Sequence, residues 1–287
     1  ALTRSGVDVN ACDHNDSTAL HKAARSTSNS AAGVIDVLVK AGGDVNALNQ
    51  LGQLPLHYAS KAGIVGAILA LLKNGAGVEG KKYQRKSPLC LASLTGVAGA
   101  DARYCPNDRQ APEDNSALDV AAANGDVGIV TALIRSEVNV NAVDWKKSTP
   151  LHKAACCTSS TAAGVIDVLV KAGADVNAVN KSMVRVPLHY ASDAGTPEAI
   201  LALLKNGARV DEKDTHERSP LRYATLKGNV PAMQALLTAG ADVNAIDCTG
   251  TTALHDATRK GNLHATGALL AAGADVNAID RTRSTAL

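Results

Sequence analysis

The sequence lacks phenylalanine and holds one tryptophan and five tyrosines, so aromatic residues make up only 2% of its 287 residues. Hydrophobic residues still reach 46%, so a core must be built from Ala, Leu, Val and Ile, which suit closely packed helices. No apolar run approaches the roughly 18 to 20 residues of a membrane-spanning helix, and the start, ALTRSGVDVN, has no signal-peptide pattern. We therefore expect a cytoplasmic chain without membrane insertion.

A strong net charge and regular cysteine spacing are also absent. The 29 basic and 27 acidic side chains give a formal charge of +2, which offers no global attraction to nucleic acid or to an anionic membrane. The six cysteines form no CxxC motif, which argues against a disulfide framework and against a zinc site. We expect reduced thiols, no bound metal and no nucleic-acid partner. The cysteines are Cys12, Cys90, Cys105, Cys156, Cys157 and Cys248.

An internal repeat is the main feature that the sequence does contain. The phrase TPLH at 149–152 recurs in related forms that begin at residues 18, 54, 87, 116, 186, 219, 252 and 285, and most of the steps between them are 33 residues. A second phrase related to AGADVNAVN follows at a nearly constant distance. Self-similarity with this period is the signature of a repeat array, in which each unit packs on its neighbours.

Each repeat predicts two short helices. Thr149 is a good N-cap and Pro150 a good first helical residue, so a helix is expected to begin there. One leucine recurs in this first helix, at residues 20, 56, 89, 118, 151, 188, 221 and 254. In the second helix Val165, Ile166, Leu169 and Val170 form one apolar face, and Gly173 lies where a left-handed residue would end the helix. Such a pair buries its apolar face only by stacking on the next copy.

These phrases closely resemble the ankyrin-repeat signature, TPLHxAA followed by LLxxGADVNAxD, which is matched best at 252–280. The resemblance covers nearly the whole chain. It implies an all-α curved solenoid of stacked helix-turn-helix repeats, with short β-hairpin fingers and the first helices forming a concave face. It also implies binding to another protein without catalysis.

The repeat boundaries predict a single array over residues 1–287. We expect 1–13 to be the tail of a preceding repeat, 14–115 to hold repeats one to three, 116–279 to hold repeats four to eight, and 280–287 to begin a truncated repeat. A four-repeat block is duplicated, since 31–49 and 162–180 agree at 17 of 19 positions. Both copies open with a repeat that carries three extra residues between its helices.

The third repeat departs from this pattern over residues 94–115. Pro106 and Pro112 break a helix, and Gly96 and Gly99 lower helical propensity. One alignment predicts a short irregular helix near 97–104 followed by an exposed loop, which we favour; another places a finger at 99 and deletes the helix. Either way we expect a weakly packed seam, which could be a hinge or a loss of structure.

Motifs that look chemical do not fit their context. The stretch GAGVEGKK at 75–82 imitates a phosphate-binding loop, but it aligns with GARVDEKD in another repeat, so Gly75 is expected to cap a helix. Five of the eight histidines end the TPLH phrase, which predicts a structural hydrogen bond and argues against a metal site. No nucleophile, base and orienting carboxylate occur at recognisable spacing, so we expect neither an enzyme nor a bound cofactor. These histidines are His21, His57, His152, His189 and His255.

The residues that follow the acidic or amide residue of each finger vary while the framework does not. Large aromatics occur there twice, as Tyr83 and Trp145, and such residues are enriched at interface hot spots. Lysines around them favour an acidic, partly apolar partner; the alternative is that they only solvate the finger tips. The predicted partner-binding residues of the fingers are His14, Asn15, Gln50, Tyr83, Gln84, Lys86, Trp145, Lys146, Ser148, Thr215, His216 and Arg218.

A second set of candidate binding residues lies near the ends of the first helices. Its members are Lys61, Asp193, Lys227, Arg259 and Lys260. Lys61 and Asp193 occupy matching positions in the two copied repeats with opposite charge, so the two blocks need not bind the same ligand. We predict a monomeric protein-interaction scaffold. The alternatives are a targeting module of a larger enzyme or membrane protein, and a purely structural stack.

Overall fold

The computed structural model of the chain describes residues 8–28, 30–62, 64–77, 117–135, 138–144, 146–181 and 183–286. The chain divides into two compact units, residues 1–139 and 140–287. Within the described ranges the regular structure is helical, and the one isolated β-bridge there joins Ile279 to Thr285. The predicted all-α repeat fold is therefore confirmed, with fingers that are hydrogen-bonded loops and not extended hairpins.

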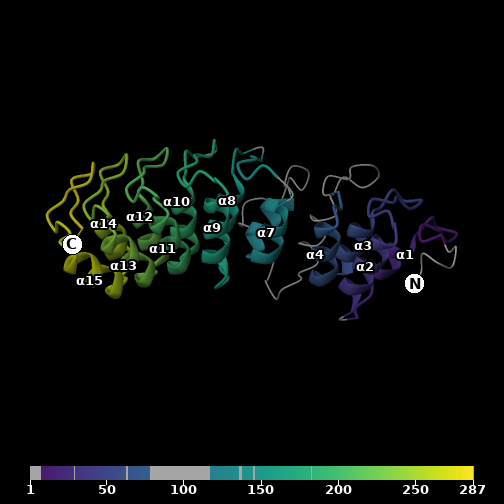
Figure 1. Cartoon of the computed structure of the whole chain (residues 1–287). Helices are drawn as coiled ribbons and strands as arrows, with labels where there is room; N and C mark the ends of the chain where they lie inside the picture. The colour runs from purple at the N-terminus through teal and green to yellow at the C-terminus, as the bar shows by residue number, and fades with distance from the viewer. Residues whose placement is uncertain are drawn as a thin grey trace. The chain divides into compact units, whose positions relative to one another are not determined.

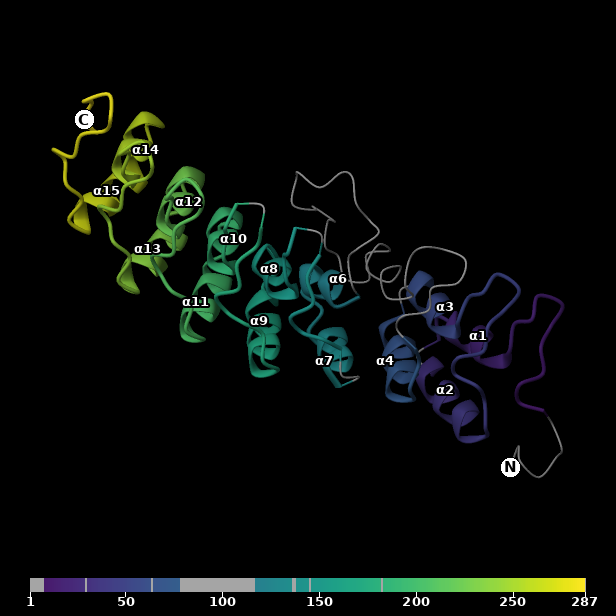
Figure 2. The ribbon, with the colours of Figure 1, turned by 90° about the horizontal axis from the view of Figure 1, so that it is seen from above.

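The second unit, residues 140–287, is a stack of helix pairs (Figures 1 and 2). The first helices pack on one another in the order α8, α10, α12, α14, and the second helices follow the order α9, α11, α13, α15. The first helices are α8 (Pro150–Ala155), α10 (Pro187–Ala194), α12 (Pro220–Lys227) and α14 (Ala253–Arg259). The second helices are α9 (Ala162–Lys171), α11 (Pro197–Lys205), α13 (Val230–Thr238) and α15 (Leu263–Ala271).

The first unit, residues 1–139, is built in the same way. Helix α1 packs on α3, while α2 packs on α4 and α4 on α7. Its first helices are α1 (Ala19–Ala24), α3 (Pro55–Ala62) and α6 (Ala117–Asn124), and its second helices are α2 (Ala31–Lys40), α4 (Val65–Lys73) and α7 (Val127–Arg135). The irregular helix predicted near 97–104 and the weak seam over 94–115 lie outside the described residues.

The recurring leucine of the first helix forms the core. Leu56, Leu118, Leu151 and Leu188 are fully buried, and Leu20, Leu221 and Leu254 are 1% exposed or less. Burying a leucine contributes roughly 1.5–3 kcal/mol relative to leaving it exposed. Pro150, Pro187 and Pro220 occupy the first turn of their helices, where a missing N–H costs nothing. The predicted helix start at Thr149 and Pro150, with one buried leucine in the helix, is confirmed.

The second helices and their connections also follow the sequence. Val165, Ile166 and Leu169 are fully buried in α9, and Gly173 has a φ of 93°, as expected for a left-handed residue after a helix. The three extra residues predicted in the duplicated repeats lengthen the loops between paired helices, which run over 25–30 and 156–161. Elsewhere the corresponding loop is as short as 195–196.

The histidine that ends each TPLH phrase ties a repeat to its own helix start and to the next finger. In α8 the His152 Nδ1 accepts the backbone N–H of Thr149 at 3.1 Å, so its proton lies on Nε2, which donates to the carbonyl of Arg185 at 3.1 Å. The Nδ1 bond recurs at His21, His57, His189 and His255. The Nε2 bond recurs at His21, His189 and His255. The structural role predicted for these histidines is confirmed, and the bond to the following repeat adds to it.

Three of these histidines also contact a tyrosine from the next repeat. The rings of His152 and Tyr190 stand edge to face at 5.5 Å between centroids, and two other pairs, His21 with Tyr58 and His189 with Tyr223, do the same. Such aromatic pairs are worth about 0.5–1.5 kcal/mol beyond the area that they bury. At these three junctions, one hydrogen bond and one aromatic contact therefore join each repeat to the next.

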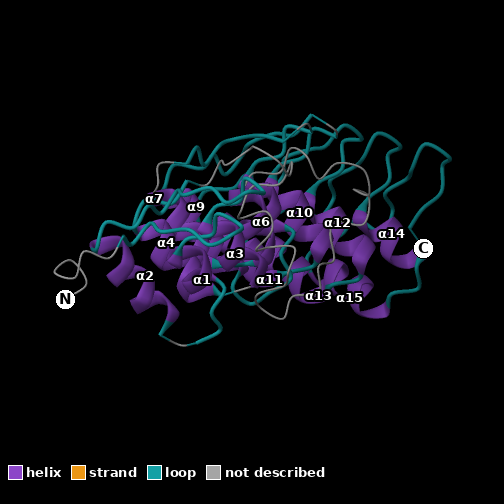
Figure 3. Ribbon diagram, turned by 90° about the vertical axis from the view of Figure 1, so that its right-hand side faces the viewer, coloured by secondary structure: helices purple, strands orange, loops and turns teal. Residues whose placement is uncertain are grey.

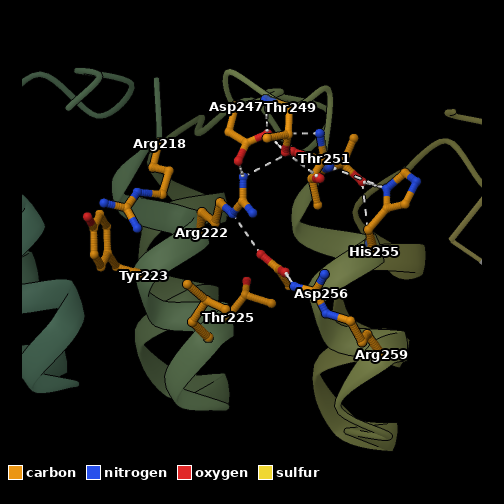
Figure 4. Close-up of polar contacts among 12 residues, drawn as sticks. Arg218, Arg222, Tyr223, Thr225, Asp247, Thr249, Thr251, His255, Asp256 and Arg259 are labelled. Atoms are coloured by element: carbon orange, nitrogen blue, oxygen red, sulfur yellow. Dashed lines mark hydrogen bonds and ion pairs between the residues drawn. The ribbon is translucent and has the colours of Figure 1, made fainter. Parts of the chain in front are cut away.

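Arg222 replaces the histidine in the SPLR phrase and changes the chemistry of that junction (Figure 4). Its Nη1 keeps the bond to the next repeat by donating to the Thr251 carbonyl at 3.3 Å, and its Nε donates to Asp256 Oδ2 at 2.7 Å. Asp256 stands where other repeats have the tyrosine. Arg222 also pairs with Asp247, so one guanidinium lies between two carboxylates of the following repeat. An ionic pair thus occupies the place of the histidine and tyrosine pair.

We predict that the stack weakens in mild acid. Burial lowers the pKa of His57 and of His152 to about 4, against about 6.5 in an unfolded chain, and burial also lowers the pKa of His21 and His189. Between pH 6.5 and 4 the unfolded chain binds more protons, so stability that is complete above pH 6.5 is lost as the pH falls. The free energy of unfolding, measured by urea denaturation, should fall between pH 7 and pH 5 by about 2 kcal/mol for each of His57 and His152. The urea midpoint should fall with it.

A pair of variants isolates this effect. His152→Gln should be less stable at pH 7 and should show a smaller change in urea midpoint between pH 7 and 5. His264→Gln, which removes an exposed histidine outside the column, should retain the wild-type pH dependence. An unchanged pH dependence in His152→Gln would contradict the assignment.

We also predict that Arg222 is required only while Asp256 is its partner. Arg222→Ala leaves Asp247 and Asp256 buried with less compensation and should cost about 3–5 kcal/mol of unfolding free energy, measured in urea at pH 7.

The double variant Arg222→His with Asp256→Tyr is the matched control. It rebuilds the histidine and tyrosine pair found between α10 and α12, with Asp247 placed to accept the tyrosine hydroxyl as Asp214 does at 2.5 Å. Its unfolding free energy should lie within about 1 kcal/mol of the wild type. A double variant as unstable as Arg222→Ala would show that the two pairs are not interchangeable.

Candidate partner-binding surface

The fingers are the loops that lead into each first helix. In the second unit they cover residues 141–149, 177–186, 211–219, 244–252 and 277–285, and they project from one side of the helix rows (Figures 1 and 3). One acidic or amide residue, which we call the closing residue, organises each finger. The closing residues of the second unit are Asp144, Asn180, Asp214, Asp247 and Asp280. The Asp144 N–H donates to the Ser148 carbonyl at 3.0 Å, and its Oδ1 accepts the N–H groups of Lys146 and Ser148 at 2.9 and 2.7 Å. The finger shape therefore depends on Asp144 and its counterparts, and not on the tip side chains.

Adjacent fingers are joined to one another. At the tips the Lys181 N–H donates to the Lys146 carbonyl at 2.8 Å, and three further bonds of this kind continue along the second unit. At the base the side chain of Asn141 donates to the Gly173 carbonyl at 2.9 Å and accepts the Asp175 N–H at 3.0 Å. Neighbouring finger tips are consequently held at a fixed spacing. The other tip bonds run from Thr215 to Met183, from Cys248 to His216 and from Arg281 to Thr249.

One tip position adopts the left-handed backbone conformation in finger after finger. Lys147, Glu217 and Arg283 have φ values of 58°, 58° and 63°, and Val184 has 55°. This conformation is unusual for a β-branched residue and costs free energy at Val184. The chain uses glycine at this position in Gly52 and Gly250 but not in most fingers. The tips therefore present side chains where glycine would be the easier choice.

The closing residue also contacts the first helix of its own repeat. Asp144 pairs with Lys153 at 2.8 Å, and Asp214 accepts the Tyr223 hydroxyl at 2.5 Å. Burial would raise the pKa of Asp214, but the hydrogen bonds from Tyr223 and Arg218 outweigh it and lower that pKa to about 2. Burial and the Asp214 carboxylate raise the pKa of the Tyr223 hydroxyl. The guanidinium groups of Arg185 and Arg218 lie 4.5 and 5.1 Å from the Tyr223 ring centre, so this finger is a charged and rigid assembly.

The residues predicted at the tips of the second unit divide into two groups. Thr215 and His216 are exposed, and Lys146 is half-buried. Ser148 is 4% exposed, and Arg218 donates to Asp214 at 2.9 Å, so both contribute to the finger framework. Burial removes Ser148 from the surface that a partner can reach. Trp145 lies outside the described residues.

In the first unit the structure brings three predicted residues together. His14, Asn15 and Gln50 are exposed; Asn15 Nδ2 lies 3.0 Å from His14 Nε2, and the Gln50 side chain donates to the His14 carbonyl at 2.9 Å. Tyr83, Gln84 and Lys86 lie outside the described residues.

The candidates on the first helices make contacts within the stack. Lys227 pairs with Asp193 of the preceding repeat at 3.4 Å, and both side chains are about half exposed. Arg259 pairs with Asp256, and the Lys260 ammonium donates to the Leu226 carbonyl. The Lys61 side chain lies outside the described ones. Exposed pairs of this kind are worth little, so Asp193 and Lys227 stay available to a partner.

Sequence reasoning missed one set of surface residues. The position just before the closing residue is aliphatic in most fingers and is not among the predicted binding residues, yet these side chains are about half exposed in both units. The signal that could have revealed this is Lys213, since a lysine within a recurring column indicates that the column faces solvent. The aliphatic residues are Leu48, Val143, Val179, Ile246 and Ile279.

Two other kinds of site do not occur in the described part of the chain. Among those residues no group of three or more His, Cys, Asp or Glu side chains is placed to hold a metal ion. None of the helices described there is long and apolar enough to cross a bilayer.

Comparison with known proteins identifies the repeat. A family model described as ankyrin repeats in three copies matches residues 1–82, 83–180 and 188–280. The putative palmitoyltransferase ZDHHC13 of Danio rerio is 27% identical over 214 residues, which cover 73% of this chain and 27% of that protein. Neurogenic locus notch homolog protein 2 of Homo sapiens and of Mus musculus is 30% identical over 190 residues, which cover 66% of this chain and 6% of each relative.

The chain thus spans about a quarter of the first relative and a small part of the other two. The similarity to the family model extends across both units and includes both the TPLH phrase and the finger phrase. The chain belongs to the ankyrin-repeat family.

Proposed function

We propose that the chain is a non-catalytic, monomeric and cytoplasmic protein-interaction module that binds a partner protein through its finger tips and the exposed ends of its first helices. Ankyrin repeats generally mediate protein–protein interaction. We further propose that residues 1–287 form one array, with repeats one to three over 14–115 and repeats four to eight over 116–279.

The observation that carries the proposal is the separation of framework from tip in each finger. Main-chain bonds and the closing residue determine the finger shape, while exposed tip side chains such as Lys181, Thr215, His216 and Arg281 differ from finger to finger. A surface with constant geometry and variable chemistry suits selective binding. The basic members favour a partner with an acidic, partly apolar surface.

A second candidate function is that of a targeting module in a larger protein. One relative is named as a putative palmitoyltransferase, and the chain matches 27% of its length. Under this alternative the repeats select a partner, and catalysis belongs to another part of the full protein. A catalytic or membrane segment in the full-length reading frame would favour it.

We predict that charge reversal at the tips abolishes partner binding. The tip variant carries three substitutions, Lys181→Glu, His216→Glu and Arg281→Glu, which turn a basic surface acidic. When immobilised, it should capture at least tenfold less of the partner than the wild-type protein captures. Partner recovery from lysate, quantified by mass spectrometry, is the measurement, followed by titration with the purified partner.

The matched control changes the net charge equally on the second helices, with Lys171→Glu, Lys205→Glu and Gln234→Glu, all at exposed residues. It should recover the partner as the wild type does, and circular dichroism should show both variants folded. Equal recovery on the tip variant and the control would overturn the proposed binding surface.

The aromatic hot spot expected from the sequence is tested in the same assay. Trp145→Ala should lower recovery of the same partner, since tryptophan is enriched among residues whose truncation weakens interfaces. Unchanged recovery would show that Trp145 does not contribute to binding and that the basic tips bind the partner without it.

A further inference from the structure

An exposed row of aliphatic side chains runs along the fingers of the second unit. Val143, Val179, Ile246 and Ile279 are 54%, 48%, 49% and 61% exposed, and we call these four residues the aliphatic row. Each precedes a closing residue, and the closing residues Asp144, Asn180 and Asp247 are buried. Successive residues of an extended segment point to opposite sides, so buried closing residues alternate with exposed aliphatic ones.

Lys213 occupies the corresponding position in the third finger of this unit, between Val179 and Ile246, and shows that neighbouring members of the row lie side by side. Its Nζ donates to the Ile246 carbonyl at 3.4 Å, which places the lysine beside the next finger of the row. Main-chain bonds between fingers hold the same spacing along the unit. The aliphatic row is therefore a strip of side chains from neighbouring fingers, with one ammonium group between Val179 and Ile246.

The fold does not require an aliphatic residue at this position. The finger that contains Lys213 closes like the others, with the Asp214 N–H donating to the Arg218 carbonyl at 3.1 Å, and it is joined to its neighbour by the bond from Thr215 to Met183 at 3.0 Å. The four aliphatic side chains are thus not explained by stacking. Exposed aliphatic side chains that recur at one position on neighbouring fingers offer a partner an apolar contact on each finger.

The charges around the row indicate the chemistry of its ligand. On the tip side, the exposed charged residues are mostly basic, namely Lys147, Lys181, Arg281 and Arg283, with Glu217 the acidic exception in the described fingers of this unit. On the base side, Asp175, Asp242 and Asp275 each accept an amide N–H of their own loop. Asp211 and Glu212 precede Lys213 in its own finger, so a ligand that covers the row meets cations at Lys213 and along the tips and carboxylates along the base.

We propose that the aliphatic row binds a segment of a partner protein that presents aliphatic side chains together with carboxylates, with one carboxylate facing Lys213. This inference rests on the proposed function. The aliphatic row supplies the apolar part of the binding surface, and the finger tips supply its basic part. Aliphatic contacts provide binding free energy, and the lysine selects acidic partners over basic ones.

Methyl NMR on the full chain tests the proposal directly. Three synthetic peptides of equal length serve as probes: alternating Leu and Glu, alternating Leu and Lys, and alternating Ser and Glu. The Leu and Glu peptide should shift the methyl signals of Ile246 and Ile279 and leave those of the buried Ile166 and Ile200 in place. The other two peptides should bind at least about fivefold more weakly, since each lacks either the carboxylates or the aliphatic groups.

Charge reversal within the row gives a second and independent readout. Lys213→Glu should weaken the Leu and Glu peptide and strengthen the Leu and Lys peptide, each by about two- to fivefold. Val179→Lys should weaken binding of the Leu and Glu peptide by interrupting the strip. Leu201→Lys is the matched control, because Leu201 is 54% exposed on α11 outside the fingers, and it should leave binding unchanged.

The outcomes separate this inference from the proposed function. Absent shifts at Ile246 and Ile279, or equal binding of all three peptides, would overturn the aliphatic row as a selective site. A doubled sedimentation mass that Ile246→Lys abolishes would overturn it in favour of a contact between two copies of the chain. If the native partner is lost in the tip variant but retained by Val179→Lys and Ile246→Lys, the proposed function stands and the aliphatic row fails.

Discussion

The imidazole at the end of each TPLH phrase is the contact on which the rest of the stack depends. It caps its own first helix through Nδ1 and reaches the next finger through Nε2, so one neutral side chain joins local structure to the junction between repeats. A short first helix such as α8 (Pro150–Ala155) has little stability alone, because helix nucleation is costly. The bond to the following repeat therefore makes each helix pair dependent on its neighbour, which is the source of cooperativity in a one-dimensional stack.

This arrangement explains why the fingers can vary. The carbonyl that accepts the hydrogen bond from the imidazole N–H belongs to the finger backbone, and the closing residue accepts hydrogen bonds from the tip amides. Tip side chains are therefore not needed for either bond. Arg222 shows how far the junction itself can change: it keeps the bond to the Thr251 carbonyl while exchanging an aromatic contact for an ionic one. The geometry is thus preserved by main-chain acceptors, and chemistry at the surface is left open.

Much of the fold could be predicted because it is determined by residues that lie close together in the sequence. The buried leucine column, the helix starts at Thr149 and Pro150 and the left-handed Gly173 all follow from local spacing. The pairing of Arg222 with Asp256 could not be predicted, because it joins residues 34 positions apart whose identities each look like isolated departures. Ser148 was misjudged for a similar reason: its place at a finger tip suggested exposure, whereas its N–H donates to Asp144 and its side chain is buried.

The duplicated blocks show which side chains are held in place by contacts between repeats. Asn74 donates to Asp36 at 2.7 Å, and Asn206 donates to Asp167 at the same distance, so both members of the pair recur in both copies. The exposed tips differ instead, with Leu51 in one copy and Met183 and Val184 in the other. Substituting one member of a cross-repeat pair leaves the other poorly satisfied, whereas a tip side chain changes at little cost. Selectivity for partners can therefore diverge between copies at the tips without disturbing the stack that positions them.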